Sequence, residues 1–432
     1  MSLIKKFPYS FLYLFLLSGA TLYLWQNHLE RFGIPAILAL MFLFFLFSKN
    51  TVMTIPLLFN AMFMVSTLPT NFAEVPTYLY FVPGVLIVGM TLHIFIYKVK
   101  LFHGKMLLGI GLMVLAMLLS SINVVKLDIY YYFYASVGIL YALFYVFYRN
   151  TIEGDYTDYL IKMLFVLGLL ISAQIVLYYL GVDDVRYALE HKIFNLGWGI
   201  SNYVATYLII FSVIPFYYAK KAPTGLLYFL IGFMEIGLIP FTGSRGGMVA
   251  FVALFPILLF ILFFKSKKKW LHFLSLSLVF ILFVSIVFIN WDFVKSVFFR
   301  FESIMFDDTG RFDIYVDAIH TFLEFPLFGG GLFARDATRD FNMFHNTILH
   351  TGATLGSIGL ISLLIQLWQQ FRITVGKFTN EGLFLAAALL GAHIHGMIDN
   401  VYYMPQFMIM MLVIVAIREK AEVHHQLIKD YQ

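Results

Sequence analysis

Apolar segments long enough to cross a lipid bilayer follow one another along almost the whole chain. A membrane-spanning helix needs roughly 20 mostly apolar residues, and about fourteen stretches approach that length. Water cannot satisfy backbone polar groups inside the bilayer, so we interpret these segments as helices, whose backbone hydrogen bonds are internal. The stretches cover residues 8–25, 33–48, 51–68, 79–97, 106–123, 129–148, 160–181, 200–218, 224–242, 246–264, 270–290, 347–371, 380–398 and 403–417.

Composition supports the same fold class. Of the 432 residues, 61% are hydrophobic and 12% are charged, whereas soluble domains carry roughly 25% charged residues. We therefore predict an all-α integral membrane protein with about 12–14 transmembrane helices, the lower counts applying if 33–48 and 51–68 form one re-entrant hairpin. The chain has no cysteine, which excludes disulfides and thiolate sites. Lys5 and Lys6 precede the first apolar run without an obvious cleavage site, which favours a retained first helix.

The basic residues divide unevenly between the two sets of loops. With the N-terminus in the cytoplasm, 19 of the 29 fall in one set, and the positive-inside rule assigns that set and both termini to the cytoplasm. Seven of the ten in the other set are arginine, against three of the nineteen. The ten are Arg31, Lys126, Arg186, Lys192, Arg245, Lys295, Arg300, Arg311, Arg335 and Arg339.

The positive-inside rule does not explain the arginine excess on the outer face, because it disfavours any cation in outer loops. A guanidinium can grip a phosphate or carboxylate with two parallel hydrogen bonds. Arg245 stands in the stretch "FTGSRGGMVA", where a tight turn explains the glycines but not the charge. We interpret Arg245 as a candidate for anion binding, with simple anchoring at the interface as the alternative.

The longest polar interruption, 290–346, is expected to be an ordered outer loop with short helices. Apolar residues recur at helical spacing in 291–306 and again after Gly310, where Pro326 ends the second segment. Gly329, Gly330 and Gly331 would let the backbone turn sharply or approach another segment closely. The residues that set the helical spacing are Phe293, Val297, Phe298, Phe301, Ile314, Ala318, Ile319 and Phe322.

Two pairs of polar residues lie at the ends of late spans. His345 and Asn346 directly precede the span at 347–371, whose small residues recur at spacings of three and four. His395 and Asp399 are four residues apart and would share a helical face. Ionisable groups at membrane depth are functional candidates. The alternative for His395 and Asp399 is a mutual pair that satisfies itself.

At these residues the sequence resembles the O-antigen ligase and O-antigen polymerase superfamily of bacterial envelope enzymes. Four stretches carry the likeness, in the family's order, over roughly 195–400. They are "GWGISNYVATYLIIFSVIP", "FTGSRGGMVAF", "GRFDIYVDAIHTFLEFPLFGGGLF" and "FHNTILHTGATLGSIGLI".

The resemblance implies a glycosyltransferase with a helical membrane fold related to the GT-C class, which inverts the anomeric centre without metal or cofactor. Such enzymes take a glycan from an undecaprenyl diphosphate carrier and pass it to a glycan or lipid-linked acceptor hydroxyl. Membrane lipid and a chain-length regulator are the further partners to consider, and nucleic acid is not expected. One departure is a loop rich in acids, which leaves room for a cation: Asp307, Asp308, Asp313, Asp317, Glu324, Asp336 and Asp340.

The resemblance also implies roles for individual residues. Arg245 and Arg311 would bind the diphosphate, His345 would be the general base, and Asp399 stands where family members often have an acid. The remaining substrate-binding candidates are Ser244, Asn346, Asn202 and His395. Elementary chemistry agrees, since fixed arginines stabilise a leaving diphosphate and a neutral histidine can take a proton near pH 7.

The sequence therefore predicts a polysaccharide polymerase in the cytoplasmic membrane, with its site on the outer face. A ligase of finished polysaccharide is the first alternative, and a flippase or transporter is the rival from another class. A transporter would need internal repeats and charges at the bilayer midplane, and neither is evident. We divide the chain into N-terminal helices (1–150), helices with the Ser-Arg-Gly turn (151–290), the extracytoplasmic loop (291–346) and C-terminal helices (347–432).

Overall fold

A computed structural model describes residues 7–67, 76–124, 129–292, 294–295, 311–331 and 344–430. The described residues are mostly helical and form no β-strand, apart from an isolated bridge between Asn195 and Ile200. The predicted all-α fold is confirmed. The α-helices are α2 (Phe11–Gln26), α3 (Glu30–Phe47), α4 (Thr54–Phe63), α5 (Thr77–Tyr97), α6 (Leu107–Leu119), α7 (Ile129–Thr151), α8 (Thr157–Leu180), α9 (Val185–Glu190), α10 (Ser201–Lys221), α11 (Leu226–Leu238), α12 (Arg245–Phe263), α13 (Lys269–Ile289), α15 (Arg311–Glu324), α16 (Thr347–Val375), α17 (Asn380–Gly396) and α18 (Pro405–Asp430).

Each of the fourteen predicted spans corresponds to a helix, with ends that differ by a few residues except at α18, which continues well beyond its predicted end. Among the described residues, six helices are long and apolar enough to cross a membrane, and five further apolar helical stretches are shorter. The predicted total of 12–14 crossings therefore stays a prediction. The six are α3, α8, α10, α12, α13 and α16.

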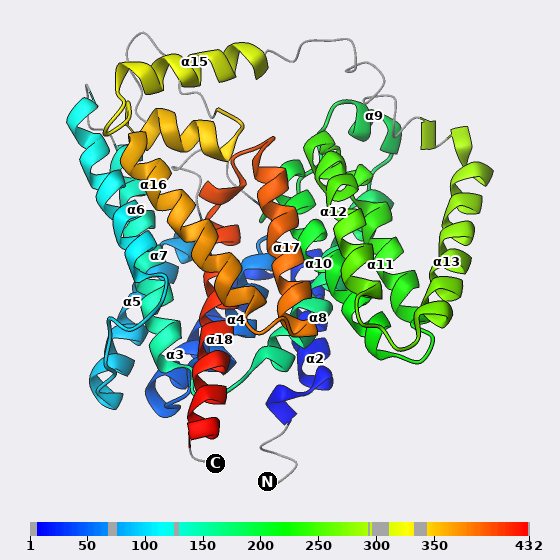
Figure 1. Cartoon of the computed structure of the whole chain (residues 1–432), viewed down its shortest axis with the longest axis horizontal. Coiled ribbons are helices and arrows are strands. Elements are labelled where there is room, and N and C mark those ends of the chain that lie inside the picture. Colours follow the sequence, from blue (N-terminus) through cyan, green and yellow to red (C-terminus); the bar gives the residue numbers. More distant parts are fainter. Residues whose placement is uncertain are drawn as a thin grey trace.

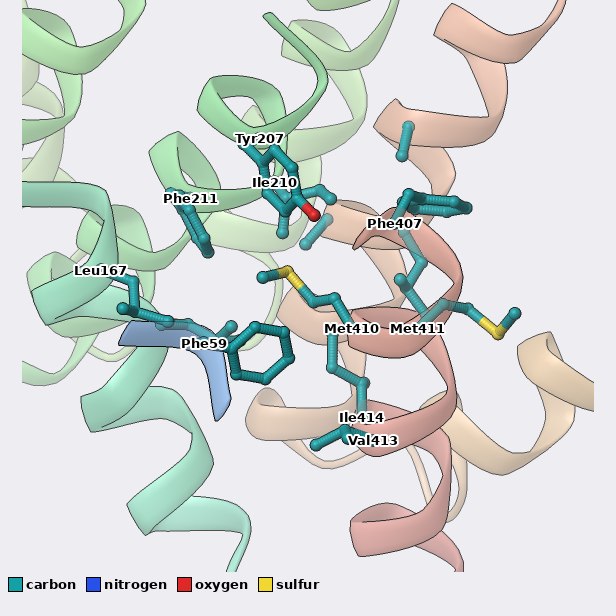
Figure 2. Close-up of a cluster of buried hydrophobic side chains, with 14 of the residues drawn as sticks. Phe59, Leu167, Tyr207, Ile210, Phe211, Phe407, Met410, Met411, Val413 and Ile414 are labelled. Atoms are coloured by element: carbon teal, nitrogen blue, oxygen red, sulfur yellow. The ribbon is translucent and has the colours of Figure 1, made fainter. Parts of the chain in front are cut away.

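The centre of the bundle is apolar. Helix α10 is enclosed by α8, α11, α12 and α17, and α18 packs against α7, α8 and α16. Met410 of α18 is directed toward Phe59 of α4 and Phe211 of α10, all three fully buried (Figure 2). Helices that are apolar on every side are stable only when surrounded by other helices or lipid. By contrast, α13 lies at the edge and packs against α11 (Figure 1).

The bundle has two distinct ends (Figure 1). At the end that we call the terminal end, α2 begins and α18 finishes. At the opposite end, which we call the loop end, α15 lies across the other helices and α9 is found nearby. Ion pairs join separate helices and loops at the terminal end. They join Lys49 to Glu153 at 2.8 Å, Lys105 to Glu422 at 2.6 Å, Arg149 to Glu419 at 2.7 Å and Lys221 to Glu381 at 2.9 Å.

Helix α15 confirms the second helical segment predicted in the outer loop, although Ile319, predicted on its apolar face, is 48% exposed. It packs on α16 through Ala318 and Ile314, and it presents its charged face outward. The first predicted amphipathic segment, 291–306, lies almost wholly outside the described residues. So do Arg300, Arg335 and Arg339.

The three glycines Gly329, Gly330 and Gly331, which we call the glycine run, allow the loop to approach α16 closely. The Gly330 N–H donates to the carbonyl of Ala353 at 2.8 Å, and the Gly331 N–H donates to that of Thr354 at 3.1 Å. A Cβ on Gly329 would lie 2.2 Å from the backbone of Thr354, so only glycine fits there. The predicted close approach is thereby confirmed.

The partner of the glycine run is an interruption in α16. At Gly356 the backbone has φ 65° and ψ −161°, which breaks the helix into two parts. A Cβ at Gly356 would lie 2.4 Å from the backbone of Leu327. The Ser357 N–H donates to the carbonyl of Pro326 at 2.8 Å. The loop thus makes backbone hydrogen bonds on both sides of the break, which a break inside a membrane helix requires.

Candidate active site

Residues that were predicted to form the site come from five separate segments, and the structure brings them together at the loop end. The segments are the start of α10, the turn before α12, the start of α15, the residues before α16, and the end of α17 with the loop that follows. Hydrogen bonds or close packing connect these segments to one another, as described below.

The Ser-Arg-Gly turn packs against the end of α17. Ser244 is fully buried and caps α12, its Oγ accepting the Gly247 N–H at 3.1 Å. The same Oγ lies 3.4 Å from Nε2 of His395. A Cβ on Gly246 would be 3.2 Å from the His395 ring, so the glycine allows this close contact. Arg245, the first residue of α12, is therefore held at the edge of the same cluster and is half-buried.

His395 is fully buried, and its ring is held from two sides. Nδ1 is 2.9 Å from Oγ1 of Thr206 on α10, while Nε2 faces Ser244. Asp399 donates its backbone N–H to the carbonyl of His395 at 3.0 Å, but its carboxylate takes other partners. The alternative of a self-satisfied pair between the side chains of His395 and Asp399 is therefore not what the structure shows.

The carboxylate of Asp399 instead pairs with His345. Nδ1 of His345 lies 3.3 Å from Oδ1 of Asp399, and the histidine side chain is 37% exposed against 10% for the aspartate. Oδ1 also accepts the Asn400 N–H at 2.8 Å. The other oxygen accepts a hydrogen bond from Nδ2 of Asn202, whose Oδ1 in turn accepts from Lys192 at 3.3 Å. A chain of polar contacts therefore runs from Lys192 through Asn202 and Asp399 to His345, the partly exposed histidine.

These contacts favour the ionised form of Asp399. Burial acts to raise the pKa of Asp399, but hydrogen bonds from His345 and from the Asn400 backbone outweigh it, so the pKa lies below its usual value. The ionised carboxylate favours the proton of His345 on Nδ1. Nε2 then carries the lone pair that can accept a proton.

Arg311 is the first residue of α15. Its charge, with that of Lys192, acts electrostatically on the buried ring of His395, which places Arg311 near this cluster. The hydroxyl of Tyr315, one turn along α15, donates to the backbone carbonyl of His345 at 3.3 Å. Helix α15 therefore links the candidate diphosphate ligand Arg311 to the backbone that carries the candidate base.

The side chain and backbone of Asn346 make hydrogen bonds that hold the start of α16 against the loop after α17. Its Oδ1 caps α16 by accepting from the N–H groups of Ile348 and Leu349, at 2.9 and 3.0 Å. Its Nδ2 donates to the carbonyl of Met397 at 2.8 Å, and its backbone N–H donates to Asn400 at 3.1 Å. These bonds fix the position of the adjacent His345. The predicted substrate contact of Asn346 stays a prediction.

Sequence reasoning missed several residues of the cluster, Tyr315 among them. Lys192 was counted among the outer cations, but nothing in the sequence placed it beside Asn202. Thr206 follows Asn202 by four residues and shares its helical face, which was the available signal. Asn400 directly follows Asp399, yet the sequence does not show that its Oδ1 meets the backbone of Asn346.

Acidic residues do not gather into a metal site in the described part of the chain. There, no group of three or more histidine, aspartate or glutamate residues could hold a metal ion. Of the loop acids, Asp313, Asp317 and Glu324 lie on α15, and the other four lie outside the described residues.

Comparison with known protein families gave a match in the central part of the chain. Residues 227–364 match the family model for O-antigen ligase. The predicted resemblance to the O-antigen ligase and polymerase superfamily is confirmed. The match runs from α11 into α16 and includes Arg245, Arg311 and His345, while Asn202, His395 and Asp399 lie outside it. It indicates a membrane glycosyltransferase of the ligase and polymerase type. Comparison with curated proteins gave no match.

Proposed function

We propose that the chain transfers a glycan from an undecaprenyl diphosphate carrier to an acceptor hydroxyl, and that it thereby polymerises polysaccharide repeat units. The single observation that carries this proposal is the chain of contacts from Lys192 through Asn202 and Asp399 to His345. It ends in a histidine that is open on one side and held by an ionised carboxylate on the other, beside arginines suited to a diphosphate.

The proposed reaction is a single displacement at the anomeric carbon. The acceptor oxygen forms the new bond to that carbon as its bond to the diphosphate oxygen breaks, and the diphosphate leaves with the electron pair. Nε2 of His345 takes the proton of the acceptor hydroxyl, and Asp399 stabilises the resulting imidazolium. Arg245 and Arg311 stabilise the charge on the diphosphate.

We further propose that the loop end faces outward from the cytoplasmic membrane and that both termini are cytoplasmic. Support comes from the charge count, because the loops of the terminal end hold the larger set of basic residues. A carrier lipid could then enter from the outer leaflet with its diphosphate at the level of Arg245 and Arg311.

A ligase of finished polysaccharide is the second candidate, because the matching family model is described as O-antigen ligase. The two reactions share a donor and a leaving group and differ in the acceptor. A flippase is the rival from another class, and the apolar packing of α10 and α18 argues against a polar path through the bundle.

The test is to identify the lipid-linked glycans that accumulate in a strain lacking the protein. Single repeat units on the outer face of the membrane support a polymerase, and long polymer left on the carrier supports a ligase. A carrier glycan trapped on the cytoplasmic side would overturn both in favour of a flippase. Restoring His345→Ala rather than wild type to the strain should leave the accumulated species in place.

A further inference from the structure

A second region of concentrated charge lies at the terminal end, at the opposite end of the bundle from the candidate active site. A cavity of about 410 Å³ opens where the end of α5, the loop after it, the end of α7 and α18 meet. Its lining includes a single carboxylate, that of Glu153, among the described residues. Its cations are Lys49, Lys98, Lys100, Arg149 and Lys420. We call this cavity the basic pocket.

Not all of these cations are neutralised within the protein. Lys49 pairs with Glu153, and Arg149 pairs with Glu419. Within the described ranges, no carboxylate lies at ion-pair distance from Lys98, Lys100 or Lys420. Three cations without a paired carboxylate that converge on one concavity create a local positive potential, which attracts an anion.

The topological role of basic residues does not account for this arrangement. The exposed run Lys267–Lys269, at the start of α13, supplies the same kind of signal from one continuous stretch of the chain. In the basic pocket, by contrast, the cations come from separate segments of the chain and face one space. Convergence from separate elements is a property of a binding site.

An apolar groove of about 260 Å³ lies next to the basic pocket, between α5 and α7, with residues of α4 and α18 also in its lining. Two of its lining residues, Ile87 and Leu143, are 44% and 48% exposed, so the groove is open toward the surrounding bilayer. Residues of the groove and of the basic pocket alternate along the chain. Leu101 lines the groove and Lys100 lines the pocket.

The same junction occurs on α7, where Phe147 lines the groove and Arg149, two residues later, lines the basic pocket. The apolar and cationic spaces therefore adjoin along two separate segments. A membrane lipid with an anionic headgroup has this combination of chemistry, an apolar chain at membrane depth and a phosphate at the interface.

We propose that the basic pocket and the apolar groove together bind one anionic phospholipid from the leaflet at the terminal end. The phosphate of the lipid contacts Lys98, Lys100 and Lys420, and an acyl chain lies in the groove between α5 and α7. This site is separate from the candidate active site, and it does not depend on which reaction the loop end performs.

The test measures lipid binding to the purified full-length protein by native mass spectrometry, with phosphatidylglycerol, phosphatidylcholine and inorganic phosphate as probes. The triple variant Lys98→Gln/Lys100→Gln/Lys420→Gln should bind phosphatidylglycerol about 10- to 100-fold more weakly, from the worth of each cation near an anionic lipid. Phosphatidylcholine binding should not change. A triple Lys→Gln variant of Lys267–Lys269 is the matched control and should bind phosphatidylglycerol like wild type.

A second variant tests the groove. Thr91 is exposed and lines the groove, so Thr91→Trp should fill it and weaken phosphatidylglycerol binding without changing the melting temperature. Leu278→Trp, at an exposed position of α13, is the control. Equal phosphatidylglycerol binding in the pocket triple variant and its control would refute the site. Strong binding of inorganic phosphate with no effect of Thr91→Trp would refute the lipid as its occupant.

Discussion

Replacing Asp399 by asparagine tests whether the polar contacts around His345 act as one unit. The amide keeps the shape of the carboxylate but puts an NH₂ group in place of one oxygen. If that group faces Asn202, two donors oppose each other, and if it faces His345, the Asn400 N–H loses its acceptor. Either arrangement leaves a buried donor unpaired, at a cost of about 1–3 kcal/mol.

The loss of charge adds to this cost. Hydrogen bonds to an ionised group are roughly twice as strong as neutral ones, so the remaining bonds to residue 399 weaken as well. We expect Asp399→Asn to lower the free energy of unfolding by about 2–4 kcal/mol in total. We expect the rate of glycan transfer to fall by about 10²–10⁴-fold, because His345 loses both its tautomer preference and the stabilisation of its charged form.

The assay combines melting temperature with a double-mutant cycle. Glycan transfer is measured for Asp399→Asn, for His345→Ala and for the two together, and a coupling of about 0.5–3 kcal/mol is expected for residues in contact. Rate losses in the two single variants that simply add up in the double variant would refute the idea that Asp399 acts through His345.

The pH dependence of stability provides an independent check. The pKa of Asp399 is lowered in the folded protein, so its stabilising contribution is complete above the pKa of a free aspartate, about 3.9. The contribution disappears as pH falls through the lower, folded-state pKa. The melting-temperature difference between wild type and Asp399→Asn should shrink as pH falls below about 4. A difference that persists unchanged at the lowest pH would contradict this assignment.

Three further predictions follow from the structure. Arg245→Lys should lose most transfer activity, because an ammonium cannot reproduce a forked contact with diphosphate oxygens. The melting temperature should stay near wild type. Wild-type turnover in this variant would return Arg245 to an anchoring role. Gly329→Ala should lower the free energy of unfolding by about 1–3 kcal/mol, since φ is +71° and the added Cβ meets Thr354, whereas Gly84→Ala, with open space around it, should not. A reporter fused after Lys268 should read cytoplasmic and one within 291–345 external, and the reverse would overturn the proposed orientation.

The helices were predictable from the sequence because each span carries its own signal in local hydropathy. The site was predictable in part, because motifs that share a chemistry stood at the ends of spans on one side. What could not be predicted was which partner each polar atom takes. His395 and Asp399 looked like a natural pair at a spacing of four, yet the chain leaves the helix after Gly396 and the carboxylate turns to His345.

The surroundings of the buried glutamate of α11 also could not be predicted from the sequence. Glu235 is fully buried, and neither of its carboxylate oxygens has a hydrogen-bond partner among the described residues. In the sequence it is one acid within an apolar span. Only the packing of α8 shows how closely it is enclosed, since a Cβ on Gly168 would lie 2.6 Å from Glu235 Oε1.

The interruption at Gly356 divides α16 into two helical parts, and different neighbours hold each part. The part beyond the break is clamped by α6 through Ser362 and Gln366, which both donate to the carbonyl of Gly109. The part before it carries His345 at its tip and is packed beneath α15. We expect a displacement of Arg311 by a bound anion to reach His345 through Tyr315, which lies on the same helix and contacts the His345 backbone. The position of His345 is thereby set by α15 and the first part of α16, separately from the part of α16 that α6 holds.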